Sequence, residues 1–590
     1  MNIGTMATFT TRPVVMGTCG VVTAGHYLAS AAGMKILQSG GNAVDAAAAM
    51  GFCLPLLEPF MNGIGGEVPI LIYSEQDRQV FAISGQGVAP KAATIEWFRE
   101  NDYSLIPGDG FLPACVPAIV DAWTIALQRF GTMTMAQVMT PAVELAERGF
   151  PMYEALHDAI ASNEKRFREL YPTTATVYLP NGCVPKIGDV FRNPDWASTL
   201  RKLIFAENAN LHKGRVDALE AARDVFYKGE VAESISDFAA ATEVLDAEGG
   251  THSALMKYND LASYHGYIEE PVTTNYRGID VFKCPPWCQG PVFLQQLNLL
   301  EGYDLHAMGH NSAEYVHTVM ECAKLAFSDR EAYYGDPLFD DVPLDVLLSK
   351  TYADERRGLV NSDTASPDLR PGEVEGHTIP DITHPAAAWG EASMHAHDTT
   401  HLDAADAAGN MVSATPSGGW FQSSPVIAGL GFSLGTRGQM FYLDSNRPNA
   451  LAPGKRPRAT LTPSLALKDG KPFMVFGTPG GDQQDQWTLQ FFLNYVEFGM
   501  DIQEAIDMPT FHSEHFPSSF YPRTHYPKRV VVENRVESDL LDELRRRGHD
   551  VVITDGWANG RVLGIRYDSE RGVMMGGASP RSKMAYAIGW

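Results

Sequence analysis

The stretch Asp398-Thr399-Thr400-His401-Leu402-Asp403 marks the point where the character of this 590-residue sequence changes. Residues 363–397, which precede it, are rich in Pro, Asp, Glu, Ala and His and follow neither a helical nor a strand period, which predicts a loop. Residues 401–405 and 411–415, which follow it, flank a turn at 406–410 and predict a β-hairpin. A loop-to-strand boundary therefore falls at the paired threonines.

Other segments carry clear periodic patterns. Apolar residues recur at helical spacing in residues 136–149, 200–207, 313–333, 487–498 and 540–548, and residues 350–361 begin helically. Strand pairs are predicted at 68–73 with 79–84 and at 464–467 with 473–476. Val21-Val22-Thr23 indicates a strand that runs into a helix, and Asn42 suits the N-cap of an Ala-rich helix beginning near Ala43. Hairpins with helices around them predict a layered α+β fold.

Several glycine-rich blocks stand in a fixed order around the threonines. After them come Gly409-Asn410-Met411-Val412-Ser413-Ala414-Thr415, Gly454-Lys455-Arg456-Pro457 and Gly477-Thr478-Pro479-Gly480-Gly481. Before them come Gly40-Gly41-Asn42-Ala43-Val44-Asp45-Ala46 and Gly63-Ile64-Gly65-Gly66-Glu67. In this order and at these separations, the blocks resemble the γ-glutamyltranspeptidase family of N-terminal-nucleophile hydrolases. The resemblance covers most of the chain, and residues 191–270 are its least distinctive part.

This resemblance implies a self-processing precursor. In that family the chain cleaves itself before a threonine, and the match places the cut between Asp398 and Thr399. A helix-rich large fragment, residues 1–398 with a flexible tail over about 363–398, and a small catalytic fragment, residues 399–590, would result. The family fold is the αββα four-layer sandwich, so we expect both fragments to share one core and to stay associated as a heterodimer. A dimer of such heterodimers is a further arrangement that we consider.

The expected chemistry centres on Thr399. A threonine hydroxyl is a weak nucleophile, but the first residue of a chain carries an α-amine that can act as its base. That amine has a reference pKa of roughly 7.7–8.0, close to the pH at which a general base must work. The resemblance assigns Ser417 as a second hydroxyl that assists the nucleophile. It assigns the backbone N–H groups of Gly480 and Gly481 to the developing oxyanion.

The sequence departs from the family where a glutamyl group would be held. Gln86 replaces the carboxylate-binding Arg, Gly419 replaces an Asn, Arg437 and Met440 replace a Gln and an amine-binding Asp, and Ala459 and Thr460 replace paired serines. A substrate ammonium buried opposite Met440 would lack its counter-charge, at a cost of several kcal/mol. Arg437 and Arg458 are candidates to grip a substrate carboxylate instead, because a guanidinium binds one bidentately. Trp420 and Phe421, beside Ser417, are expected to pack rather than to line an acyl pocket.

The composition restricts the partners. A formal net charge of -25 argues against nucleic acid, which requires a basic face. The seven cysteines all precede Thr399, so no disulfide can join the two predicted fragments. Residues 1–20 lack the pattern of a secretory signal and no run of 18 apolar residues exists, so we expect no membrane association and a cytoplasmic location. His395, His397 and His401 surround the cut, but no carboxylate completes a ligand set, so we expect neither a metal nor a cofactor.

Together these patterns predict a threonine-nucleophile amidohydrolase or acyltransferase that cleaves a small-molecule amide through an acyl-enzyme on Thr399. The first alternative is a true γ-glutamyl hydrolase or transferase, acting on glutathione or γ-glutamyl amides with a different clamp. The second alternative, from another class, is a non-catalytic binding protein on the same fold. The sequence gives neither the natural substrate nor the acyl acceptor.

Overall fold

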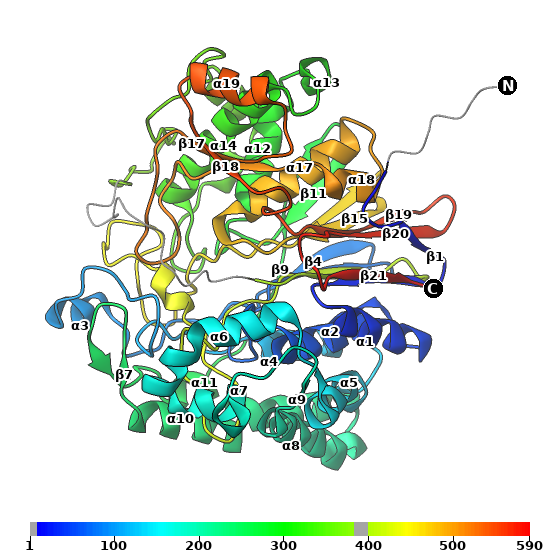
Figure 1. Ribbon diagram of the computed structural model, residues 1–590, viewed down its shortest axis with the longest axis vertical. Helices are drawn as coiled ribbons and strands as arrows, with labels where there is room; N and C mark the ends of the chain where they lie inside the picture. The colour runs from blue at the N-terminus through cyan, green and yellow to red at the C-terminus, as the bar shows by residue number, and fades with distance from the viewer. Residues whose placement is uncertain (1–8, 383–398) are drawn as a thin grey trace.

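The computed structural model describes residues 9–382 and 399–590, and two seven-stranded sheets in this part of the chain form the centre of a four-layer sandwich (Figure 1). The first sheet has the order β1 (Val15–Gly17), β20 (Val573–Ala578), β19 (Leu563–Asp568), β15 (Lys471–Gly477), β14 (Ser464–Lys468), β11 (Ile279–Lys283) and β10 (Val272–Tyr276). The second has the order β21 (Tyr586–Gly589), β2 (Gly20–Ala24), β12 (Leu402–Asp406), β13 (Met411–Ala414), β3 (Ile70–Ser74), β4 (Gln79–Ile83) and β9 (Ile268–Glu269).

Three buried clusters explain the layering. Between the sheets lies a layer to which Val21, Leu71 and Met411 contribute from one sheet and Val475 and Ile565 from the other. The larger clusters lie on the outer faces, where helices cover each sheet. Because both faces of each sheet are buried, strands such as β2 and β3 have no exposed residue. The predicted αββα sandwich is confirmed.

The helices divide into two outer layers, seen below and above the sheets in Figure 1. The layer against the second sheet includes α1 (Tyr27–Gln38), α2 (Ala43–Leu57), α4 (Ile119–Phe130), α5 (Met135–Arg148), α6 (Glu154–Glu169), α8 (Pro194–Asn210), α9 (Arg215–Tyr227) and α10 (Glu230–Ala241). The layer against the first sheet includes α12 (Pro291–Leu300), α14 (Ala313–Tyr333), α17 (Gln484–Val496), α18 (Ile502–Asp507) and α19 (Ser538–Arg546).

Most sequence predictions of individual elements are confirmed. The helix over residues 313–333 has the predicted bounds, and the Asn42 side chain caps α2 by accepting hydrogen bonds from Val44 and Asp45. β12 and β13 pair antiparallel as the predicted hairpin. Residues 363–382 contain no helix or strand, and the rest of the predicted loop lies outside the described residues. The prediction at 200–207 found only part of α8, and α6, α9 and α10 were not predicted.

Both predicted fragments contribute strands to both sheets. In the second sheet, β12 of the C-terminal part pairs with β2 of the N-terminal part, and β13 pairs with β3. In the first sheet, β11 pairs with β14. The seven cysteines, all of which precede Thr399, are free thiols in the structure. In the described ranges, every helix is too short or too polar to span a bilayer.

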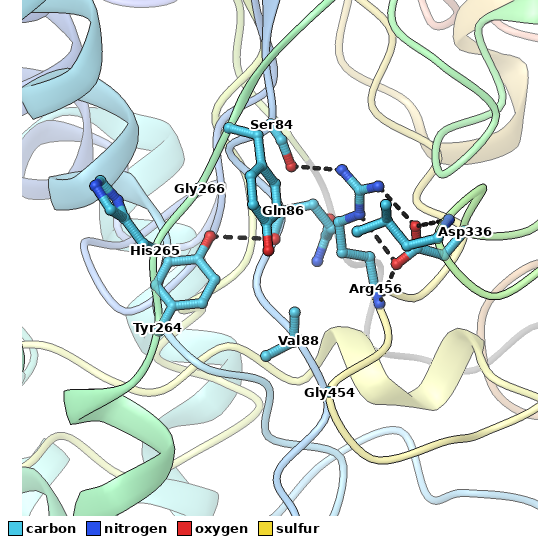
Figure 2. A pocket seen from close by; sticks show the side chains of 11 residues that line it. Ser84, Gln86, Val88, Tyr264, His265, Gly266, Asp336, Gly454 and Arg456 are labelled. Atoms are coloured by element: carbon cyan, nitrogen blue, oxygen red, sulfur yellow. Dashed lines mark hydrogen bonds and ion pairs between the residues drawn. The ribbon is translucent and has the colours of Figure 1, made fainter.

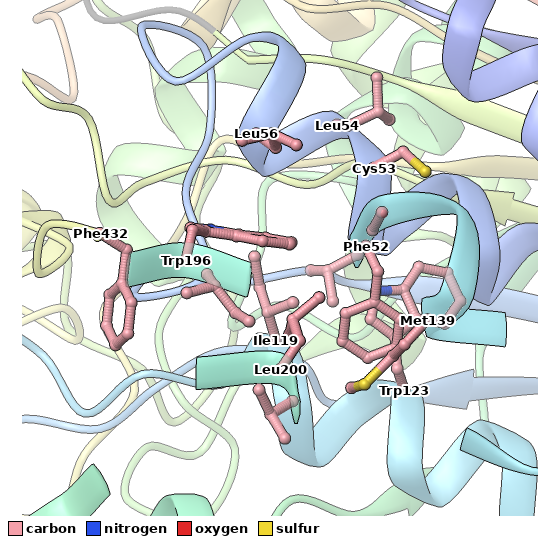
Figure 3. Close-up of a cluster of buried hydrophobic side chains, with 14 of the residues drawn as sticks. Phe52, Cys53, Leu54, Leu56, Ile119, Trp123, Met139, Trp196, Leu200 and Phe432 are labelled. Carbon is pink, nitrogen blue, oxygen red and sulfur yellow. The ribbon is translucent and has the colours of Figure 1, made fainter. Parts of the chain in front are cut away.

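The cluster against the second sheet joins segments that are distant in sequence. Phe52 and Cys53 from α2, Trp123 from α4, Met139 from α5 and Phe432 from the C-terminal part gather in Figure 3. Trp123 is fully buried, and a methyl group added at Gly51 would lie 2.4 Å from its ring. The indole is therefore packed against backbone that carries no side chain.

Replacing Trp123 with alanine is expected to lower the free energy of unfolding by about 3–5 kcal/mol, because the large cavity it leaves cannot collapse. Urea denaturation followed by circular dichroism measures the loss. Phe205→Ala is the control, since Phe205 is 76% exposed and its removal is expected to change stability by less than about 0.5 kcal/mol. Equal losses in the two variants would contradict the packing described here.

Candidate active site

Thr399 lies just before β12, at the end of the sandwich. It forms an isolated antiparallel bridge with Ser417, and its Oγ1 lies 3.0 Å from the Ser417 Oγ. Ser417 in turn exchanges backbone hydrogen bonds with Glu67, of 2.9 and 3.0 Å. Thr399 is 1% exposed and Ser417 is fully buried. The two hydroxyls that the sequence singled out are therefore in direct contact.

The residues after Thr399 fix the strand in place. The Thr400 Oγ1 donates to Glu58 over 2.7 Å, and the Thr400 N–H donates to the Pro416 carbonyl. The two ring nitrogens of His401 bond to Thr415 and Asp403, at 3.0 and 2.9 Å. His401 is thus fully engaged inside the sandwich, while His395, His397 and Asp398 lie outside the described residues.

Arg437 connects the hydroxyl pair to a buried carboxylate. Its Nε donates to the Glu67 Oε1 over 2.7 Å, and a terminal nitrogen donates to the Ser417 Oγ over 2.7 Å. Its other terminal nitrogen lies 3.7 Å from the Met440 sulfur. The guanidinium also lies over the Trp420 ring, 5.0 Å from the centroid. We predicted that Arg437 could bind a substrate carboxylate, but in the structure it binds the carboxylate of Glu67.

The electrostatics of this corner follow from its burial. Burial raises the pKa of Glu67, and the charge and hydrogen bond of Arg437 offset part of the rise. Because Ser417 accepts from Arg437, its own hydrogen is directed to another acceptor, and Thr399 Oγ1 is at hydrogen-bond distance. The arrangement can hold the Thr399 oxygen and stabilise negative charge on it.

Aromatic side chains connect the turn at Gly480 and Gly481 to Arg437. Gly480 and Gly481 have φ angles of 124° and 56°, and an added Cβ would meet Trp487 at 2.1 Å and Phe520 at 2.9 Å respectively. Phe520 packs beside Trp420, with ring centroids 6.3 Å apart, and beneath Arg437. Only glycine fits at these two positions, as close backbone approach would require.

The remaining substrate-binding candidates are distributed around this centre. Ala459 accepts from the backbone N–H of Gln289, whose side chain donates toward the carbonyls of Gly481 and Asp482 at 3.5 and 3.3 Å. Thr460, next in sequence, is buried, and its hydroxyl has no hydrogen-bond partner among the described residues. Gly419 packs directly on the Gly63 backbone.

Arg458 is also engaged. It pairs with Glu331 at 2.8 Å and donates to the Arg330 carbonyl. Burial opposes ionisation of Glu331, but Arg458 and Arg330 outweigh it and hold the pKa of that carboxyl well below its usual range. Arg458 therefore belongs to a buried ion-pair network with Glu331, whereas we had predicted that it could bind a substrate carboxylate.

Gln86 lies in a small separate cavity of about 20 Å³ (Figure 2). Its side-chain nitrogen donates to the Gly87 carbonyl, and its backbone carbonyl accepts from the Tyr264 hydroxyl. Across the cavity, Arg456 pairs with Asp336 and donates to Ser84. The hydrogen bonds at Gln86 thus lead to Tyr264 rather than to Thr399.

One group of side chains elsewhere has a metal-like composition. In the described ranges, ligand atoms of His317, Glu321 and His549 lie within 4.8 Å of one another. However, the two imidazoles already face each other at 2.8 Å, and both Lys324 and Arg370 pair with Glu321. These positive charges oppose a cation, so the geometry favours a structural cluster.

Comparison with known proteins agrees with this geometry. The γ-glutamyltranspeptidase family model matches residues 29–589. The chain belongs to the γ-glutamyltranspeptidase family. It is 32% identical to the glutathione hydrolase-like YwrD proenzyme of Bacillus subtilis, over 98% of this chain and 99% of that protein. Membership makes the chain an enzyme of the amidohydrolase and acyltransferase type.

Two solved structures match nearly the whole length of this γ-glutamyltranspeptidase-family enzyme. The structure of LmbA2991HD is 44% identical, with a TM-score of 0.94, and the match covers 99% of this chain and 100% of that one. The cephalosporin acylase from Bacillus halodurans is 30% identical, with a TM-score of 0.83, over 100% and 98% of the two chains.

The sequence analysis gave no role to two residues of the candidate site, Glu67 and Glu58. Glu67 stood in a recognised glycine block without a role, and Glu58 had no signal apart from its position before Pro59. The partner of Glu67 is 370 residues away, so only the folded chain reveals the pair.

Replacing Arg437 with methionine is expected to destabilise the protein by about 3–5 kcal/mol, because Glu67 is left buried without its counter-charge. The double variant Glu67→Gln with Arg437→Met is expected to recover most of the loss, since neither charge then remains. Urea denaturation compares the variants with Arg571→Met, a control at a position whose side chain is 81% exposed. A double variant as unstable as the single one would contradict this account.

Proposed function

We propose that the chain cleaves itself between Asp398 and Thr399 and then uses Thr399 as an N-terminal nucleophile to cleave a small amide. The contact that carries this proposal is the 3.0 Å approach of the Thr399 and Ser417 hydroxyls, buried at the start of β12. Membership of the family and the proenzyme name of the Bacillus subtilis relative support self-processing.

The proposed reaction begins when the Thr399 α-amine, freed by the cut, accepts the proton of the Thr399 hydroxyl. The oxygen attacks the amide carbonyl, and the N–H groups of Gly480 and Gly481 hold the resulting oxyanion. The amine product leaves with a proton, which gives an acyl-enzyme on Thr399, and water or an acceptor amine then releases the acyl group. Ser417, oriented by Arg437, donates to the Thr399 oxygen as charge develops on it.

The same geometry supports a substrate without an α-amino-acid head group. Glu67 and Arg437 neutralise each other, and Met440 offers a sulfur where a substrate ammonium would need a carboxylate. Binding a γ-glutamyl group there would require breaking a buried ion pair, which costs several kcal/mol. The similar protein from Bacillus halodurans is named a cephalosporin acylase, which is in keeping with an acyl group other than glutamyl.

We further propose that the two fragments remain associated, since each sheet contains strands of both.

Intact mass spectrometry of the purified protein tests the nucleophile. The wild-type chain is expected to give two fragments, residues 1–398 and 399–590, and Thr399→Ala a single chain. Thr399→Ser keeps a hydroxyl and is the matched control that should still cut. Cleavage in Thr399→Ala, or a cut elsewhere, would overturn the assignment.

Substitution of Ser417 tests the hydroxyl pair. Loss of a hydrogen bond to a charged oxygen costs about 1.5–3 kcal/mol, so Ser417→Ala is expected to slow self-cleavage about ten- to a hundredfold. Ser417→Thr retains the donor and should stay closer to the wild-type rate. Time courses of fragment appearance measure both, and equal rates in Ser417→Ala and the wild type would exclude a role for this hydroxyl.

Substrate charge is tested with three 4-nitroanilides: butanoyl, glutaryl and γ-glutamyl. The butanoyl compound is expected to have the highest kcat/KM and the γ-glutamyl compound the lowest, because its ammonium has no counter-charge at Met440. Thr399→Ala provides the background rate. A preference for the γ-glutamyl compound would favour a true γ-glutamyl hydrolase instead.

A further inference from the structure

A cavity of about 270 Å³ has in its wall Glu58, the carboxylate that accepts a hydrogen bond from Thr400. Apolar groups from three separate segments contribute to its wall: Phe60 and Met61 after α2, Tyr153 and Ala155 at the start of α6, and Met584 before β21. None of these residues was assigned a role by the sequence.

Three hydrogen bonds connect this cavity to the proposed machinery. Glu58, in its wall, accepts from Thr400, the residue after the nucleophile. The carbonyl of Met61 accepts from the Trp420 indole over 2.8 Å. The backbone N–H of Arg561 donates over 2.9 Å to the Thr478 hydroxyl, just before Gly480.

The strand registers place the cavity at the same end of the sandwich as Thr399. Ala24, at the end of β2, pairs with both Leu402 at the start of β12 and Tyr586 at the start of β21. In the other sheet, Gly477 at the end of β15 pairs with Leu563 at the start of β19. The segments just beyond these positions supply the cavity wall and the glycine turn together.

Six charged residues also line the cavity, and ion pairs hold three of them, Arg581, Lys583 and Glu154; the others are Glu58, Asp158 and Arg561. Arg581 pairs with Glu533 at 2.9 Å and donates to the carbonyls of Ile506 and Met508. At the rim, Lys583 pairs with Glu154. The Tyr153 hydroxyl donates to the Leu57 carbonyl over 2.7 Å. Because the hydroxyl is already bonded, Tyr153 contributes its aromatic ring to the cavity wall. Most of the surface that the cavity exposes is nevertheless apolar, which favours an apolar group as its occupant.

We propose that this cavity binds the acyl group of the substrate and that this group is an aryl or medium-length alkyl chain. An apolar cavity of about 150 Å³ accommodates benzene, so the space here accommodates a larger ring or a chain of several carbons. The inference rests on the proposed function, since it assigns the acyl side of an amide that Thr399 attacks.

Two measurements test the assignment. Saturation-transfer NMR with hexanamide and phenylacetamide, both neutral, detects binding to the mature protein without catalysis. The kcat/KM values of the acetyl, butanoyl and hexanoyl 4-nitroanilides report the chain-length preference. About fourfold per added methylene is expected while the chain fills the cavity, because each buried CH₂ contributes about 0.8 kcal/mol.

Ala155→Trp fills the cavity from an exposed position in the first turn of α6. It is expected to abolish amide binding and to flatten the chain-length series, while self-cleavage continues. Ala161→Trp, exposed on the same helix and outside the cavity wall, is the matched control and should retain both properties.

The possible results separate this inference from the proposed function. Thr399-dependent turnover with no chain-length preference, or with no effect of Ala155→Trp, would overturn the cavity assignment and leave the function standing. Amide binding that Ala155→Trp abolishes, without turnover of any anilide, would support the cavity and overturn the proposed reaction. Absence of both binding and turnover would overturn both.

Discussion

The buried ion pair between Glu67 and Arg437 is the interaction on which the rest of the candidate site depends. It joins a loop of the N-terminal part to a short turn of the C-terminal part, and Arg437 also donates to Ser417. A charged pair this deep is stable only while every donor and acceptor around it is satisfied, so its neighbours have little freedom. Ser417 is held by it from one side and by the backbone of Glu67 from another, and Thr399 meets Ser417 across a single bridge. The position of the nucleophile is thus set by charge as well as by the sheet.

The same pair bears on the substrate that we propose. The chain belongs to the family, whereas the motif comparison predicts that the residues that hold a glutamyl head group in the family are replaced here. Two buried arginines near the site are already paired with carboxylates: Arg437 with Glu67, and Arg458 with Glu331. In the proposed reaction, substrate recognition would then come from surfaces other than these two ion pairs. The cavity that has Glu58 in its wall is our proposed surface, and its wall includes residues after α2, at the start of α6 and before β21.

The sequence predicted the periodic and locally capped elements well. The helix at 313–333 and the α2 cap at Asn42 were predictable because each carries its signal within a few residues. α9 and α10 begin at Gly214 and Gly229 without any side-chain cap, so neither has a local start signal. Their buried apolar residues do recur at helical spacing, as in Leu219, Ala222 and Phe226, but the sequence prediction did not use this pattern. α8 did carry a signal, Asn193 before Pro194, which was overlooked. In the candidate site, motif order singled out Thr399 and Ser417, whose hydroxyls are in contact in the structure, and the glycine pair. It could not show that Arg437 is already paired, because that contact joins residues 370 positions apart.

The interleaving of strands from both parts of the chain has a consequence for timing. Thr399 and Ser417 flank a hairpin whose two strands find their other partners, β2 and β3, in the N-terminal part. The hairpin that brings the two hydroxyls together is fixed in the sandwich only when these distant strands have paired with it, and such non-local pairing is slow. In the proposed mechanism, a backbone cut that requires this fixed contact acts as a quality check, because a misfolded chain keeps Thr399 as an ordinary internal residue. Correct folding and the gain of reactivity would then be one irreversible step.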